Sequence, residues 1–128
     1  MTYYFSKQLT APFDEARTRT IAALKAEGFG IISEIDVKKT LEEKIGAAFR
    51  DYRILGACNP KLALEALELE DKIGTMLPCN VVVQGRDKGT VEVAAIDPVA
   101  SMQAVDNPRL KQAAAAVGAK LKRAIEAL

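Results

Sequence analysis

The strongest constraint on the fold is a hairpin signal in the second half of the chain. Two runs rich in β-branched and apolar residues, 79–84 and 90–96, flank a short polar loop at residues 85–89. This loop has a glycine at each end, which is typical of the connection between two paired strands. Any sheet in this chain must therefore contain at least one antiparallel pair.

Three further strands and four helices are expected around this hairpin. Aromatic or β-branched runs predict the strands, and apolar residues at helical spacing predict the helices. The order β-α-β-α-β-α-β-β-α predicts an α+β two-layer sandwich, in which a mixed or antiparallel sheet carries helices on one face. The strands are expected at residues 3–7, 29–37 and 52–58, and the helices over roughly residues 12–25, 40–48, 60–68 and 108–128.

Several helix starts carry capping signals. An asparagine or aspartate directly before a proline matches an N-cap followed by proline at the first helical position. This device occurs at residues 59–60, 97–98 and 107–108. The stretch from Thr40 to Glu43 fits a capping box, which predicts that the second helix begins at Thr40.

Composition excludes several classes of function. With 128 residues, the chain has the length of one domain, so we expect residues 1–128 to fold as a single unit. It contains no histidine, which removes Ser-His and Cys-His nucleophiles and the usual zinc and non-haem iron ligand sets. The net charge of +1 and the lack of tryptophan argue against a nucleic-acid partner. No cofactor or metal is expected.

The chain carries no signal for a membrane or for export. No apolar run approaches the roughly 20 residues that span a bilayer. Residues 1–7 lack the basic and apolar stretches of a signal peptide. We therefore expect a cytoplasmic protein whose cysteines stay reduced.

Two longer motifs resemble a known family. The motifs are Tyr-Arg-Ile-Leu-Gly-Ala-Cys-Asn-Pro at residues 52–60 and Gly-Thr-Met-Leu-Pro-Cys-Asn-Val-Val-Val at residues 74–83. Together with the aromatic start at residues 3–5 and the segment 28–37, they resemble the bacterial and archaeal family called domain of unknown function 302, over roughly residues 1–105. The resemblance implies a small two-layer α/β domain that pairs as a homodimer. It implies no activity, and it does not imply thiol chemistry, because one branch of the family lacks these cysteines.

Cys58 and Cys79 are the first candidates for a site. Cys58 directly precedes a helix N-cap, where the helix dipole can lower a thiol pKa. Two thiols together could bind a soft metal or cycle through a disulfide. The alternative is that both are small buried core residues. A strand-helix-strand unit normally has parallel strands, which would put the two cysteines at opposite ends of the sheet, beyond disulfide reach.

Three polar residues complete the set of candidate ligand-binding positions. Asn59 is most simply a helix cap. Asn80 interrupts a strand otherwise made of valine, so it either faces solvent or holds a buried hydrogen bond. Arg53 would assist if the proline-capped helix starts bound an anion.

These observations favour a non-catalytic, homodimeric module that binds a small ligand or a protein partner. The alternative is a thiol-based redox or soft-metal-binding protein that uses Cys58 and Cys79. An enzyme that uses carboxylates with Tyr52 or Arg53 has no motif behind it. Burial can shift a thiol pKa more than an exposed helix dipole does, so we expect Cys58 to be alkylated slowly in the native protein and rapidly only after unfolding.

Overall fold

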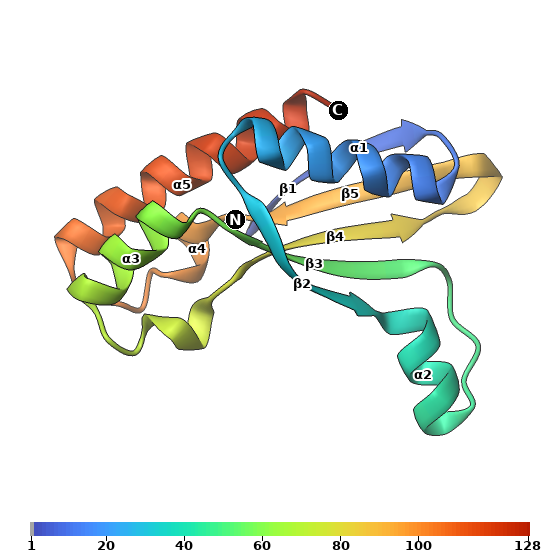
Figure 1. The fold of residues 1–128 in the computed structure, drawn as a ribbon, viewed down its shortest axis with the longest axis horizontal. Coiled ribbons are helices and arrows are strands. Elements are labelled where there is room, and N and C mark those ends of the chain that lie inside the picture. The colour runs from blue at the N-terminus through green and yellow to red at the C-terminus, as the bar shows by residue number, and fades with distance from the viewer. Residues whose placement is uncertain (1) are drawn as a thin grey trace.

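A five-stranded antiparallel sheet forms the centre of the computed structural model, which describes residues 2–128 (Figure 1). Every neighbouring pair of strands is antiparallel. The predicted hairpin is confirmed, with Val83 opposite Val93. In spatial order the strands are β1 (Tyr4–Thr10), β5 (Thr90–Ile96), β4 (Cys79–Gly85), β3 (Tyr52–Cys58) and β2 (Gly30–Asp36).

Helices α1 and α5 lie side by side on one face of this sheet (Figure 1). The fold is thus the predicted α+β two-layer sandwich, with the sheet resolved as fully antiparallel. The cap signal at residues 97–98 marks the start of the short helix α4, which the predicted element order left out. The two single turns, η1 and η2, were not predicted. The helical elements are α1 (Phe13–Ala26), α2 (Val37–Ile45), α3 (Pro60–Leu69), η1 (Ile73–Met76), η2 (Asp87–Gly89), α4 (Pro98–Ser101) and α5 (Pro108–Glu126).

All three proline-associated caps are confirmed. The side-chain oxygen of Asn59 accepts from the backbone N–H of Leu62 at 3.2 Å. Asp97 caps α4, and Asn107 caps α5. Each cap satisfies N–H groups that would otherwise have no partner in the first turn of a helix.

The predicted start of the second helix is wrong. Helix α2 begins at Val37 instead of Thr40, so Thr40 lies inside the helix. Its N-cap is Asp36, whose carboxylate accepts from the backbone N–H of Lys39 at 3.0 Å. The last residue of strand β2 therefore serves directly as the cap, and no loop separates strand from helix. Gly46 ends the helix with a left-handed φ of 64°, which glycine adopts without strain.

The prediction that the strands around α3 are parallel is also wrong. Helix α3 lies beyond the ends of β3 and β4 instead of running back along the sheet (Figure 1). Residues 70–78 then return the chain to the end of the sheet that it had left at Cys58. As a result, β4 runs antiparallel to β3, and Ala57 is opposite Cys79. Both cysteines therefore lie at the same end of the sheet.

The core is divided into two clusters. The larger one lies between the sheet and helices α1 and α5, and includes Leu24, Leu55 and Leu121. The smaller one lies beyond the end of the sheet, where α3, η1, α4 and α5 meet, and includes Ile73, Met102 and Leu110. The opposite face of the sheet carries no helix layer: along β5, inward residues are buried and outward ones are half-buried.

Candidate functional site

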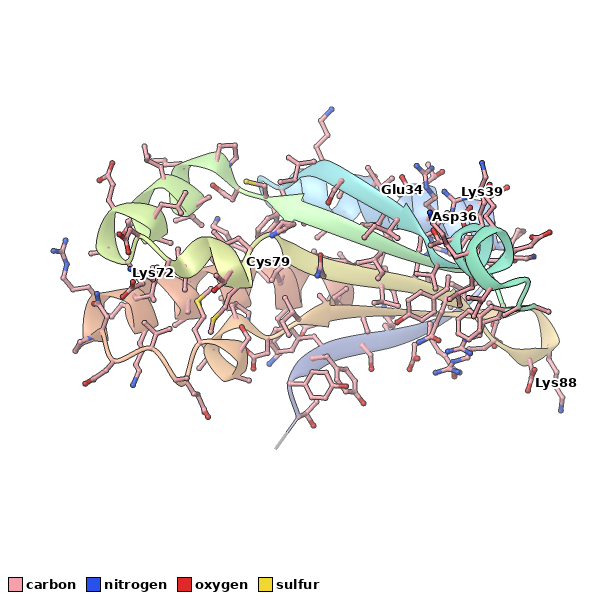
Figure 2. All side chains as sticks on the ribbon, turned by 90° about the horizontal axis from the view of Figure 1, so that it is seen from below. Glu34, Asp36, Lys39, Lys72, Cys79 and Lys88 are labelled. Atoms are coloured by element: carbon pink, nitrogen blue, oxygen red, sulfur yellow. The ribbon has the colours of Figure 1, made fainter. Side chains whose placement is uncertain are left out.

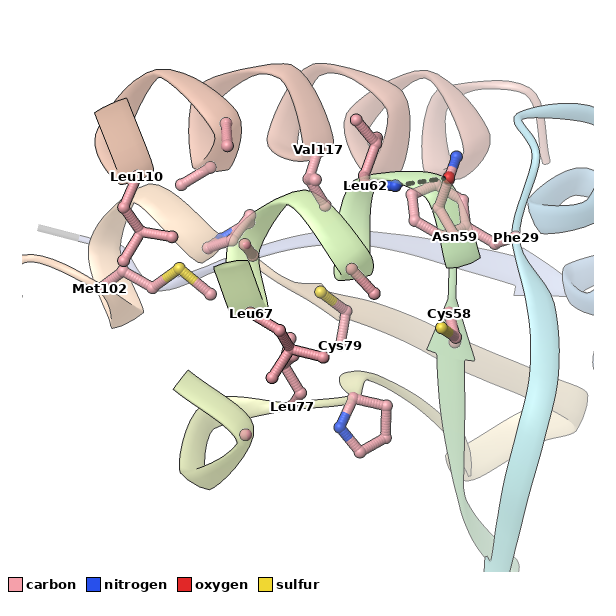
Figure 3. Close-up of a pocket in the computed structure, with 18 of the residues that line it drawn as sticks. Phe29, Cys58, Asn59, Leu62, Leu67, Leu77, Cys79, Met102, Leu110 and Val117 are labelled. Carbon is pink, nitrogen blue, oxygen red and sulfur yellow. Dashed lines mark hydrogen bonds between the residues drawn. The ribbon is translucent and has the colours of Figure 1, made fainter. Parts of the chain in front are cut away.

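A cavity of about 330 Å³ lies at the end of the sheet, between the two core clusters (Figure 3). Helices α3 and α5 form two of its walls, and the segment from η1 to Pro78 forms a third. Ala57 and Cys79 contribute from the last paired positions of strands β3 and β4. The lining residues are Phe29, Ile32, Ala57, Cys58, Asn59, Leu62, Ala63, Ala66, Leu67, Gly74, Leu77, Pro78, Cys79, Pro98, Met102, Leu110, Ala113, Ala114 and Val117.

The cavity exists because small side chains stand where two helices face each other. Ala63 and Ala66 on α3 and Ala113 and Ala114 on α5 all border the empty space. Protein interiors normally contain few voids larger than a water molecule. A space of this size is at the lower end of the range for small-molecule sites, which is about 300–1,000 Å³.

The lining is almost entirely apolar. Among residues 2–128, no Asp, Glu, Lys, Arg or Tyr side chain borders the cavity, and its polar lining consists of Asn59, Cys58 and Cys79. The side-chain oxygen of Asn59 is already engaged as the cap of α3, as the dashed line in Figure 3 shows. An apolar lining of this kind favours apolar guests over charged ones.

A β-bulge shapes one side of the cavity. The register between β2 and β3 shifts between Ile31 and Ser33, which leaves Ile32 without a partner residue. Ile32 borders the cavity and is 65 % exposed. Bulges are common beside binding sites because they redirect one side chain. Here the redirected side chain is a large apolar one that stands at the solvent-exposed side of the cavity.

The thiol of Cys79 is held in its neutral form. Burial raises the pKa of Cys79 to about 11, and the nearby Cys58 adds a smaller effect in the same direction. A thiol with this pKa is almost fully protonated at neutral pH, whereas nucleophilic attack and metal binding need the thiolate. Among residues 2–128, no cluster of three or more metal-ligating side chains is present either. The alternative of a thiol-based redox or soft-metal protein is not supported.

Two of the five candidate residues lie away from the cavity. Arg53 pairs with Glu34 at 2.7 Å and with Asp36 at 3.4 Å, near the other end of β3. Asn80 is opposite Gly56 and borders a shallow hollow on the face of the sheet that lacks helices. The structure therefore brings together Cys58, Asn59 and Cys79 and separates them from Arg53 and Asn80.

Sequence reasoning missed most of the cavity wall. Met102, Leu77 and Phe29 were not singled out, although each borders the space. Apolar residues at helical spacing predicted helices α3 and α5, but their alanines gave no indication of unfilled volume. The alanines of α3 and α5 are visible in the sequence, but by themselves they indicate a close helix contact and not an open space.

The fold and the cavity define a class of protein: an α+β sandwich whose apolar binding space lies at one end of an antiparallel sheet. The family described as domain of unknown function DUF302 matches residues 5–128. The chain belongs to this family. Within residues 2–128, no helix has the length and apolar character needed to cross a membrane.

The fold is also similar to a solved structure. This is the crystal structure of an uncharacterised conserved DUF302 protein from Bacillus stearothermophilus. The two proteins share 27 % sequence identity, 98 % of each chain is covered, and the TM-score is 0.91. No curated protein matches the chain. Neither the family nor the solved structure carries an assigned function.

Proposed function

We propose that this protein is a homodimeric module that binds a small, uncharged, apolar ligand in the cavity between α3 and α5. The single observation that carries the proposal is an unfilled space of about 330 Å³ with an apolar wall. If a water molecule takes about 30 Å³ in the liquid, the space holds roughly ten non-hydrogen atoms. This is the size of a two-ring aromatic compound or a medium-length hydrocarbon chain.

The lining favours a ligand without charge. Burying an unpaired charge in an apolar space costs far more than burying a neutral group. Among the described residues the cavity offers no charged partner, and the buried Cys79 thiol is neutral and only a weak donor. The lining also lacks a Lys, Tyr or carboxylate that would act as a general acid or base. These features support binding over catalysis.

The homodimer is supported by the uncovered face of the sheet. Tyr4, Ile54, Val82, Ala94 and Ile96 are all at outward positions of their strands. An antiparallel sheet with helices on one face either leaves the other face to water or pairs it. These apolar residues alternate with polar ones such as Asn80, Gln84 and Glu92, and a mixed surface of this kind is usual in protein interfaces. A cytoplasmic location agrees with the two free cysteines.

Binding of naphthalene and of naphthoate tests the ligand proposal. Naphthalene is neutral and fits the estimated size, whereas naphthoate adds a carboxylate to the same rings. We expect naphthalene to raise the melting temperature of the protein, because a ligand that binds only the folded state stabilises it. We expect naphthoate to bind at least about tenfold more weakly, because its charge has no partner in the cavity.

Two phenylalanine variants locate the binding. Ala113→Phe fills part of the cavity, whereas Ala116→Phe adds the same ring to an exposed position on the same helix. Naphthalene should stabilise the Ala116→Phe variant like the unmodified protein and should not stabilise Ala113→Phe. Circular dichroism establishes that both variants are folded. Equal stabilisation of both variants, or no response of the unmodified protein, would overturn the proposal.

A further inference from the structure

The cavity between α3 and α5 has a buried side and an open side. Met102, Leu110 and Ala114 border it and are at most 5 % exposed, so we call these three residues the floor. Ile32 and Leu67 also border it but are 65 % and 41 % exposed, so we call them the mouth. A ligand therefore enters past the mouth, and the part of it that enters first comes to rest on the floor.

The polar lining of the cavity is unevenly distributed. Figure 3 shows Cys58 and Asn59 at one end of the cavity and Met102 and Leu110 at the other. Cys58 and Asn59 are half-buried, whereas the floor consists of apolar side chains. A polar group beside Cys58 and Asn59 can keep its contact with water, but a polar group on the floor would lose it without compensation. A ligand with one polar end therefore has one favourable orientation.

The length of the cavity agrees with its volume. Leu110 and Val117 both border the space, and they lie about 10 Å apart along α5 at 1.5 Å per residue. The volume of about 330 Å³ holds roughly ten non-hydrogen atoms. An extended chain advances about 1.2 Å per bond, so a linear chain of roughly ten atoms spans about 11 Å. A medium-length linear chain thus fits the space in both length and volume.

Charged side chains lie away from the cavity. Figure 2 shows Glu34 and Asp36 at the other end of the sheet from Cys79, which borders the cavity. Lys72 lies toward the cavity end, but its side chain is 84 % exposed and pairs with Asp71 at 3.4 Å. Because no charged side chain among residues 2–128 borders the space, the polar end of the ligand is uncharged.

We propose that the ligand is a medium-chain neutral amphiphile, such as a fatty alcohol, which lies along α5. Its apolar end rests on Met102, and its uncharged polar end lies beside Cys58 and Asn59. This inference rests on the proposed function and specifies the class and the orientation of its ligand. Met102 closes the floor with a long side chain, so Met102 sets the longest chain that fits.

A series of 1-alkanols from hexanol to undecanol tests the chain length. Each CH₂ group that enters the cavity should tighten binding about fourfold, because its burial removes a fixed apolar area from water. The gain should stop at about nine carbons, where roughly ten non-hydrogen atoms fill the space. Isothermal titration calorimetry measures the Kd of each alcohol.

Substitutions of Met102 test whether this residue sets the limit. Met102→Ala removes about three non-hydrogen atoms from the floor, so the gain should continue for about two or three more carbons. Met102→Leu is the matched control, because it nearly conserves the volume of the side chain and should leave the limit unchanged.

A second pair of variants keeps the test decisive if Met102→Ala fails to fold. Ala114→Leu adds about three non-hydrogen atoms to the floor, so the gain should stop about two or three carbons earlier. Ala115→Leu makes the same change at an exposed neighbouring position on α5 and should not alter the series. Circular dichroism establishes which variants are folded.

A comparison of 1,9-nonanediol with 1-nonanol tests the orientation. The diol carries a hydroxyl at each end, so one hydroxyl must lie on the floor, where the side chains of Met102, Leu110 and Ala114 offer it no strong partner. We expect the diol to bind at least about tenfold more weakly than 1-nonanol. Equal affinity of the two compounds would overturn the orientation.

The outcomes separate this inference from the proposed function. If naphthalene does not bind, the proposed function fails. If naphthalene binds but the alcohol series has no limit, or has a limit that neither Met102→Ala nor Ala114→Leu moves, this inference alone is overturned. A limit that moves to longer chains in Met102→Ala and to shorter chains in Ala114→Leu supports it.

Discussion

Ala57 lies directly opposite Cys79 on the antiparallel strands β3 and β4, and this pair marks the end of the sheet where the cavity begins. Cys58 is the next residue after the pair, so both thiols border the same cavity. They differ in environment, because Cys58 is half-buried and Cys79 is only 7 % exposed. Their proximity follows from the route of the chain around α3.

The raised pKa of Cys79 makes stability depend on alkaline pH. The unfolded thiol ionises near its ordinary value of 9.0, whereas the folded thiol ionises near about 11. The stability that the protein gains by keeping the Cys79 thiol neutral is therefore fully present below pH 9.0. It is lost as the pH rises toward about 11, and the total loss is up to about 3 kcal/mol. Denaturant unfolding of the protein and of Cys79→Ala across this window measures it. Between pH 9.0 and about 11, the free energy of unfolding should fall less for Cys79→Ala than for the unmodified protein. Parallel plots of this free energy against pH would contradict the prediction.

Alkylation should distinguish the two thiols. Burial of Cys79 and its high pKa predict that iodoacetamide modifies Cys58 first at neutral pH. Slow labelling of Cys58 in the native protein stays a prediction. Because Cys58 borders the cavity, saturating naphthalene should slow the labelling of Cys58 further. A short pulse followed by mass spectrometry gives both rates. Faster labelling of Cys79, or no effect of naphthalene, would be inconsistent with this assignment.

Glu34 should confer stability that is lost in acid. Arg17 donates to both of its carboxylate oxygens, at 2.6 and 2.7 Å, and Arg53 donates at 2.7 Å. The hydrogen bond from Arg17 is the main cause that holds the pKa of Glu34 below its ordinary value of 4.5. The stability that ionised Glu34 contributes is present above pH 4.5. It disappears as the pH falls through the lowered pKa of Glu34 in the folded protein.

Glu34→Gln tests this contribution. We expect it to destabilise the protein at neutral pH by about 1–2 kcal/mol, and to flatten the acid part of the stability profile. Urea unfolding between neutral and acidic pH measures both effects. Glu65→Gln, at an exposed position on α3, is the control and should change little. A Glu34→Gln profile that falls as steeply in acid as that of the unmodified protein would argue against the ion pair.

Gly56 should be intolerant of even one added carbon. A Cβ atom there would lie 2.1 Å from the Ser33 Oγ and 2.7 Å from a ring carbon of Pro78. The serine can rotate, but the proline ring cannot move far, so Gly56→Ala should destabilise the protein by about 1–3 kcal/mol. Gly30→Ala is the control, because nothing lies within 4 Å of its Cβ position. Equal melting temperatures for the two variants would refute the packing argument.

Local patterns in the sequence predicted the elements well, because local physics decides them. The caps at Asn59, Asp97 and Asn107 and the hairpin at residues 85–89 each depend on residues close in sequence. The start of α2 was missed because the capping box at Thr40 competed with Asp36, and the aspartate at the strand end caps the helix instead.

The cavity could not be predicted, because it depends on packing between distant segments. The position of α3 beyond the end of the sheet decides that β4 returns antiparallel, and hence that Cys79 meets Ala57. Strand-helix-strand units typically have parallel strands, and this rule predicted that the two cysteines lie at opposite ends of the sheet. Alanines on α3 and α5 predict a close helix contact from sequence alone, whereas in the fold they border an open space.

The most direct test of the central claim is a crystal structure of the protein soaked with bromonaphthalene. The anomalous signal of bromine identifies the ligand without ambiguity. The account predicts a bromine peak inside the cavity, in contact with side chains such as Leu62, Ala114 and Cys79. Ordered water in the cavity, or a bromine peak only on the uncovered face of the sheet, would contradict it.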